Sequence, residues 1–154
     1  MTARLIPIVL IAIASCRFQD LTPGGSRHDE ATIQAVVASL YQALGAKNAA
    51  ALERVALPSA TALVAADASA PVLIPLRTLL DVPERRNQDG GARVVRTELR
   101  PDGDVAIDRV VVVSRSRDGR HEYEATDLFT IARRLGEWRV AHAVFGPWRS
   151  RSAP

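Results

Sequence analysis

The second half of the chain alternates between long strand-like segments and short turn sequences, and this pattern constrains the fold more than any other feature. The segments are rich in residues that favour strands, and one of them holds the β-branched cluster Val110–Val113. Because strands joined by hairpins pair antiparallel, this half of the chain predicts an antiparallel sheet. The predicted strands are residues 92–99, 105–116, 123–132 and 138–145, with turns at 101–104, 118–119 and 133–137.

The residues before this sheet predict a long amphipathic helix. Apolar side chains recur at three- and four-residue spacing, which places them on one stripe of a helix. We expect the helix to begin at Ser26 or Asp29 and to end at Gly45, with Gly45 in a left-handed conformation. The stripe comprises Ile33, Val36, Val37, Leu40, Tyr41 and Leu44.

A second, shorter helix is predicted over residues 49–56, with Asn48 as its N-cap and Pro58 as its stop. Helices that precede a series of hairpins indicate the α+β class, in which the helices pack on one face of a curved antiparallel sheet. Between the two parts we expect short strands at 61–66 and 70–74, a small helix at 75–80 and an exposed polar loop at 84–91.

The amino terminus has the pattern of an export signal. Arg4 precedes an uncharged apolar run that is too short to span a bilayer, which needs about 20 apolar residues. The run ends in Ala14-Ser15-Cys16, and Cys16 is the only cysteine of the chain. This ending resembles a bacterial lipobox, which implies cleavage before Cys16 and attachment of lipid to its thiol and amino group. The alternative is an ordinary secretory signal whose cysteine is incidental.

These features divide the chain into a signal peptide (1–15), a lipidated tether (16–27), one folded domain (28–147) and a flexible tail (148–154). Pro23, Gly24 and Gly25 are typical of a tether. The lipobox implies the cell envelope, with the protein anchored by lipid on the periplasmic face. Arg17 stands where an aspartate would be the familiar inner-membrane retention signal, so the outer membrane is favoured.

Composition excludes several classes of function. The formal charge is only +3, and the arginines are scattered among acidic residues, so we expect no nucleic-acid binding. A single cysteine allows no disulfide, and His28, His121 and His142 lie in different segments, so no metal site is predicted. The sequence has no nucleotide-binding glycine loop, and we predict no cofactor.

Two stretches, Val72–Thr78 and Thr126–His142, resemble the nuclear transport factor 2-like superfamily, which includes ketosteroid isomerase-like and polyketide cyclase-like proteins. The nearest branch is that of small bacterial proteins described as lumazine-binding. The resemblance implies a cone-shaped α+β fold whose sheet curls around an apolar pocket. It also implies a homodimer as one form of the protein.

Within this fold, Asp127, Tyr123 and His142 are the candidate catalytic residues. A carboxyl group in an apolar pocket can act as a general base, and Tyr123 could polarise a carbonyl group. Arg109 is a candidate partner for an anion. The candidates for ligand binding are Tyr41, Tyr123, Phe129 and His142.

The hairpin that joins the last two strands decides whether Asp127 and His142 can cooperate. We expect a three-residue loop with Gly136 in a left-handed bulge and Arg133 opposite Glu137, because a two-residue loop would place Leu135 at positive φ. In that register the two side chains point to opposite faces. Asp127 is then either a solvated residue or the partner of Arg139, and His142 is a partly buried residue with one hydrogen bond.

These observations predict a lipid-anchored envelope protein that binds a small apolar ligand or an envelope protein and catalyses no reaction. The alternative is an isomerase, cyclase or dehydratase that uses Asp127 as general base.

Overall fold

The computed structural model describes residues 27–65, 70–82, 93–116 and 119–151. The predicted leader, residues 16–26 of the tether and the polar loop at 84–91 lie outside these residues. The helices are α1 (Arg27–Gly45), α2 (Ala49–Val55) and the 3₁₀ helix η1 (Leu76–Leu80). The strands are β1 (Ala56–Val64), β2 (Val72–Pro75), β3 (Arg93–Asp102), β4 (Val105–Arg115), β5 (Glu122–Arg134), β6 (Glu137–Phe145) and β7 (Arg149–Ser150).

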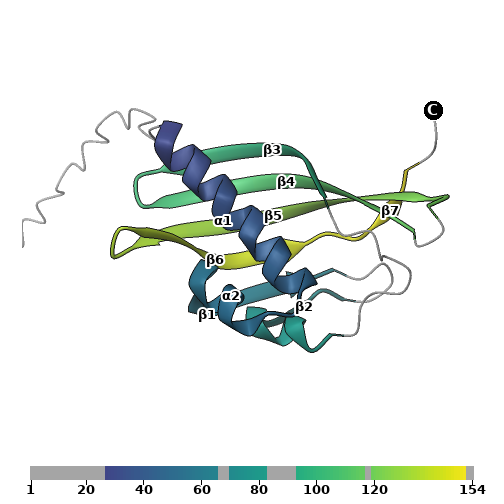
Figure 1. Cartoon of the computed structure of the whole chain (residues 1–154), viewed down its shortest axis with the longest axis horizontal. Coiled ribbons are helices and arrows are strands. Elements are labelled where there is room, and N and C mark those ends of the chain that lie inside the picture. Colours follow the sequence, from purple (N-terminus) through teal and green to yellow (C-terminus); the bar gives the residue numbers. More distant parts are fainter. Residues whose placement is uncertain (1–26, 66–69, 83–92, 117–118, 152–154) are drawn as a thin grey trace, which may run out of the picture.

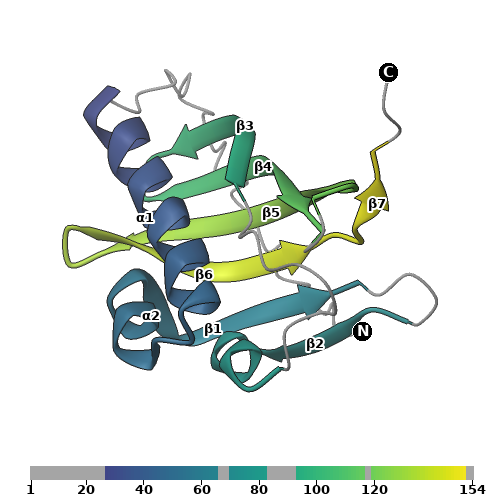
Figure 2. The same ribbon diagram turned by 45° about the vertical axis from the view of Figure 1, so that its right-hand side comes forward.

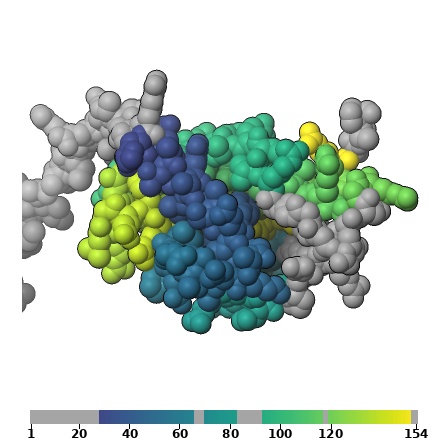
Figure 3. All heavy atoms as spheres, in the orientation of Figure 1, coloured from purple at the N-terminus to yellow at the C-terminus, as the bar shows by residue number. Residues whose placement is uncertain are grey.

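The strands form one curved sheet in the order β2-β1-β6-β5-β4-β3, and β7 pairs with β5. Helices α1 and α2 lie on one face of this sheet, and α1 crosses its strands obliquely (Figures 1 and 2). The predicted α+β class, with helices on one face of a curved sheet, is confirmed. The space-filling view shows α1 and α2 side by side as one layer (Figure 3).

The prediction that the sheet is purely antiparallel is wrong, because β1 and β6 pair parallel. Hairpins fix the antiparallel pairing of β3, β4, β5 and β6, which follow one another in the chain. β1 and β6 are far apart in sequence, so no turn dictates the direction of their pairing. β1 also begins at residue 56 rather than 61, directly after α2, and Pro58 lies inside it.

The predicted stripe of α1 is confirmed. Ile33, Val37 and Leu40 are fully buried against the sheet, while the other three members of the stripe are partly buried around them. Asn48 caps α2 by accepting a hydrogen bond of 3.0 Å from the backbone N–H of Ala51. The left-handed residue after α1 is Lys47 (φ 50°) rather than Gly45, since the chain turns two residues later than expected.

The first turn of α1 is held to the β5–β6 hairpin by a polar cluster. The Asp29 carboxylate accepts a hydrogen bond of 3.2 Å from the indole N–H of Trp138. It also forms an ion pair of 2.9 Å with Arg133. The Arg133 guanidinium also lies over the Trp138 ring, 4.5 Å from its centre. Together these contacts fix the start of the helix relative to the sheet.

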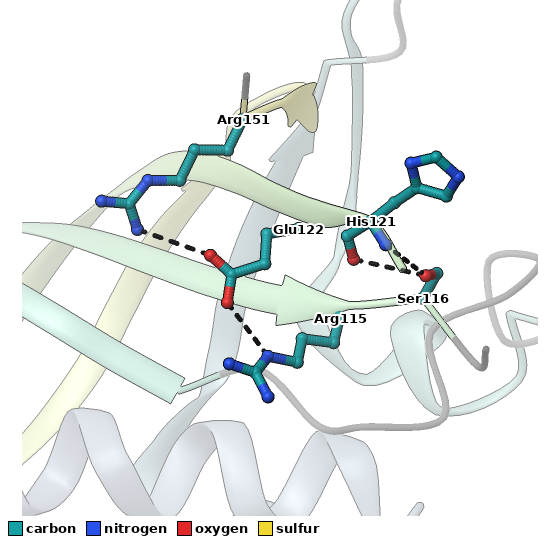
Figure 4. A network of polar contacts seen from close by, with 5 residues as sticks. All are labelled: Arg115, Ser116, His121, Glu122 and Arg151. Atoms are coloured by element: carbon teal, nitrogen blue, oxygen red, sulfur yellow. Dashed lines mark hydrogen bonds and ion pairs between the residues drawn. The ribbon is translucent and has the colours of Figure 1, made fainter. Parts of the chain in front are cut away.

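The sheet has a helix-facing side and an outer face. On the helix-facing side, alternate residues of β4 and β5 are buried, namely Ala106, Asp108, Val110, Val112 and Ser114 of β4 and Ala125, Asp127, Phe129 and Ile131 of β5. Val111 and Val113 of β4, which point to the outer face, are buried as well. The β4–β5 hairpin is closed by Ser116, whose hydroxyl accepts a hydrogen bond of 3.0 Å from the backbone N–H of His121 (Figure 4).

Regular structure continues past residue 147, where we expected a flexible tail to begin. Trp148 packs against the core, and Arg149–Ser150 continues the edge of β5 as β7. Within the described residues, no helix combines the length and the apolar character needed to cross a membrane.

The predicted three-residue loop of the β5–β6 hairpin is wrong. Arg134 pairs with Glu137, so the loop has two residues, and both Leu135 (φ 54°) and Gly136 (φ 82°) are left-handed. This loop type matches the twist of the strands, and the gain outweighs the strain at Leu135. A bulge between residues 140 and 142 then shifts the register by one further residue.

Leu135 gives a direct test of the hairpin. Its side chain is 97 % exposed, so it contributes strain but little packing. We expect Leu135→Asn to raise the free energy of unfolding by about 1 kcal/mol, because asparagine tolerates left-handed backbone better than leucine. Leu135→Ala is the matched control and should bring no such gain in a denaturant titration. Equal stability of the wild type and Leu135→Asn would contradict the two-residue loop.

Candidate functional site

Asp127 is the polar centre of the helix-facing side. It is 3 % exposed, and its two carboxylate oxygens accept hydrogen bonds from different parts of the chain. The Tyr41 hydroxyl donates to Oδ2 at 2.6 Å, and the backbone N–H of Gly146 donates to Oδ1 at 3.0 Å. Both expected environments of Asp127 are therefore wrong: it is neither solvated nor paired with Arg139, which binds Glu137 at 2.7 Å on the outer face.

Gly146 can make this contact because it has no side chain. A Cβ atom at this position would lie 2.3 Å from the backbone carbonyl oxygen of Thr126. The chain that leaves β6 at Phe145 thus passes directly against the backbone of β5. This close approach brings the N–H of Gly146 to the buried carboxylate.

Three aromatic rings pack beside the carboxylate. The Tyr41 and Phe129 rings meet edge to face with centres 5.7 Å apart, and Phe129 and Phe145 do the same at 5.9 Å. Phe129 is completely buried. Tyr41 is partly buried, so of these two predicted ligand-binding residues only Tyr41 keeps some exposed surface.

The Tyr41 hydroxyl stays protonated in this setting. Burial raises the pKa of Tyr41 far above its usual range, and the charge of Asp127, the hydrogen bond to it and the charge of Asp108 raise it further. The phenol is thus a donor whose proton is directed at Asp127. Since both oxygens of Asp127 accept hydrogen bonds, the arrangement joins α1, β5 and the chain after β6.

Asp108 is a second buried carboxyl group on the same side of the sheet, and the sequence reasoning did not single it out. It is 1 % exposed, and the Thr97 hydroxyl of β3 donates a hydrogen bond to it. Burial raises the pKa of Asp108, while the Thr97 hydrogen bond opposes that rise. Its alternation with Ala106, Val110 and Val112 in the sequence is the signal that could have placed it on the apolar face.

Ser114 and Tyr123 lie opposite one another in the β4–β5 ladder, further along the same side. Ser114 is 2 % exposed, and its hydroxyl has no hydrogen-bond partner within the described part of the chain. Tyr123, a predicted site residue, is partly buried beside it. The pair therefore offers two hydroxyl groups beside the apolar side chains of Val112 and Ala125.

His142 and Arg109 belong to the outer face. His142 Nδ1 is hydrogen-bonded to the Thr61 hydroxyl at 2.8 Å, and Thr130 is its neighbour on β5. Asp127 and His142 thus lie on opposite faces, as the sequence predicts, although the register differs from the expected one. Arg109 makes an ion pair of 3.1 Å with Glu98. In the described segments, no three histidine, cysteine or acidic side chains gather as metal ligands would.

No family model and no curated protein sequence matches the chain. Solved structures are nonetheless similar in fold. An NTF-2 like protein of unknown function from Silicibacter pomeroyi is 18 % identical with a TM-score of 0.55, over 80 % of this chain and 97 % of that one.

Two further structures have enzyme-related names. A ketosteroid isomerase-like protein from Erwinia carotovora atroseptica is 14 % identical with a TM-score of 0.59, over 82 % of this chain and all of that one. A type 2 hexachlorocyclohexane dehydrochlorinase is 13 % identical with a TM-score of 0.55, over 82 % and 91 % of the two chains. These likenesses support the resemblance found in the sequence and show that the chain has the fold of the nuclear transport factor 2-like proteins.

Proposed function

We propose that this chain is a lipid-anchored binding protein of the bacterial cell envelope, which holds a small, largely apolar ligand on the helix-facing side of its sheet. The predicted leader, which ends just before Cys16, supports the anchor. The buried hydroxyl of Ser114 is the observation that supports the proposed ligand. Among the described residues this hydroxyl has no hydrogen-bond partner; such a buried group costs about 1–3 kcal/mol, and a ligand that hydrogen-bonds to it would recover that cost.

The neighbours of Ser114 define the chemistry that such a ligand needs. Val112 and Ala125 flank it with apolar surface, and Tyr123 supplies a second hydroxyl from the facing strand. A ligand with an apolar body and one or two polar atoms fits this combination. Asp127 lies further along the same side and is already engaged by Tyr41 and Gly146, which favours binding over catalysis.

Replacing Ser114 separates ligand binding from stability. The amount of ligand that co-purifies with Ser114→Ala should be about tenfold lower than with the wild type, because one hydrogen bond to the ligand is lost. The same variant without ligand should be about 1 kcal/mol more stable, because it lacks a buried hydroxyl that has no partner in the described segments. Full-length protein from membranes is extracted for mass spectrometry, and the ligand-free protein is melted.

Ser116→Ala is the matched control, since its hydroxyl is hydrogen-bonded to the backbone of His121. This variant should lose about 1 kcal/mol of stability and keep the ligand. Undiminished ligand in Ser114→Ala, or no co-purified small molecule from the wild type, would reject the binding site.

The anchor is tested separately at Cys16. Cys16→Ser should remove the acyl chains, which contribute about 0.8 kcal/mol per buried CH₂, and should abolish incorporation of labelled palmitate. The protein should then leave the membrane fraction or remain with an unprocessed leader. Unchanged mass and unchanged fractionation of the variant would exclude lipidation.

A second candidate is an isomerase, cyclase or dehydratase, the reaction types in which a carboxyl group transfers a proton. The observation that favours it is the pair of buried carboxyl groups, Asp108 and Asp127, on one side of the sheet with Tyr41. In this alternative Asp127 exchanges its bond to Tyr41 for a substrate, and Asp108 holds a proton at a higher pH than an exposed aspartate does.

The raised pKa of Asp108 has a measurable consequence. Above the ordinary value of 3.8 the folded state binds more protons at Asp108 than the unfolded state does, so this group lowers stability as the pH rises through its folded pKa. Asp108→Asn keeps an acceptor for Thr97 but carries no charge. We expect this variant to gain stability over the wild type as the pH rises from about 4 to 7. If the stability of the wild type and of Asp108→Asn changed in parallel with pH, the pKa of Asp108 would not be raised.

A further inference from the structure

The outer face of the sheet carries an excess of positive charge. Residues that lie opposite one another on neighbouring strands point to the same face, so the strand register shows on which face each charged side chain lies. Strands β3 and β4 contribute Arg93, Arg96, Arg100, Arg109 and Arg115. The remaining strands and the residue after β7 contribute Arg134, Arg139, Arg149 and Arg151. The carboxylates of this face, among the described residues, are Glu98, Asp102, Glu122, Glu124 and Glu137.

Nine arginines against five carboxylates leave an excess of four positive charges, which exceeds the net charge of +3 for the whole chain. The rest of the molecule is therefore net negative, and the basic side is the outer face. Glu122 shows how the carboxylates are used: it lies between Arg115 at 3.0 Å and Arg151 at 3.9 Å (Figure 4). In the described part of the chain, Arg93, Arg100 and Arg149 make no direct ion pair.

The same face exposes aliphatic side chains among its arginines. Ile107 is 53 % exposed, and Val105 and Leu128 near it are also exposed on this side, whereas Val111 and Val113 further along β4 are buried. Cationic side chains around exposed aliphatic ones suit the boundary of a bilayer, where anionic headgroups lie beside acyl chains. The arginines are spread over several strands, so the positive charge is suited to an extended, negatively charged surface such as a bilayer.

We propose that this outer face lies against anionic phospholipid headgroups of the membrane to which the protein is tethered, an inference that rests on the proposed anchor at Cys16. Ten residues separate Cys16 from the start of α1, so the domain stays within about 40 Å of its anchor. A second copy of the chain is a poorer occupant, because a symmetric contact would bring two positive faces together.

The test uses the full-length chain with Cys16→Ser, so that acyl chains do not bind every vesicle alike. Sedimentation compares vesicles of phosphatidylcholine with vesicles that also contain roughly 30 % phosphatidylglycerol, whose surface is anionic. We expect at least tenfold stronger binding to the anionic vesicles, and loss of this preference in about 1 M salt, where the Debye length is about 3 Å. The apolar leader is common to all samples.

Two triple variants remove the same number of positive charges, one from the outer face and one from positions outside it. Arg93→Gln, Arg100→Gln and Arg149→Gln act on the outer face, whereas Lys47→Gln, Arg54→Gln and Arg77→Gln lie at exposed positions outside it. The outer-face variant should bind anionic vesicles about a hundredfold more weakly, since each arginine contributes about 1 kcal/mol there, and the control should bind nearly as the wild type does. Thermal melts verify that both remain folded.

Equal loss in both triple variants, or equal binding to neutral and anionic vesicles, would overturn the proposal. Retained vesicle binding by the outer-face variant, with loss of an acidic envelope protein from cross-linked cells, would assign the face to a protein partner instead. The vesicle-binding result does not depend on lipidation, because Cys16 is replaced in every sample. Failure of lipidation in cells would leave the vesicle measurement intact.

Discussion

The buried carboxylate of Asp127 holds together three parts of the molecule that are distant in sequence. Tyr41 reaches it from the long helix, Gly146 reaches it from the chain that leaves β6, and Asp127 itself belongs to the central strand β5. A buried carboxylate is tolerated only with such partners, because its removal from water costs several kcal/mol. Helix, sheet and carboxy-terminal strand are thereby fixed relative to one another, and Trp148 and β7 follow in place.

The two sides of the sheet divide the chemistry of the protein between them. The helix-facing side concentrates the uncharged and buried polar groups, among them Ser114, Tyr123 and Asp108, in a setting of low polarity where each hydrogen bond matters. The outer face carries arginines that water and counterions screen. The proposed ligand site and the proposed membrane-facing surface therefore lie on separate sides of one sheet.

Much of this fold was predictable from local patterns, and the exceptions have physical causes. The stripe of α1, the cap at Asn48 and the four long strands are encoded by nearby residues. The parallel pairing of β1 with β6 joins segments that are far apart in sequence, and no local turn sequence indicates it. The strained Leu135 shows that strand twist can outweigh a local preference. The partners of Asp127 were missed because they come from residues 86 positions before it and 19 after it, although alternation alone placed its side chain on the face opposite His142.

The edge strand β2 limits how readily the sheet can pair with the sheet of another molecule. Its exposed Val72 and Leu73 are attractive sites for the addition of a foreign strand. The strand has only four residues, however; Pro71 precedes it and Pro75 is its last residue, and the nitrogen atoms of both prolines cannot donate hydrogen bonds. An incoming strand finds too short a ladder at this edge, so β2 resists edge-to-edge polymerisation of the protein.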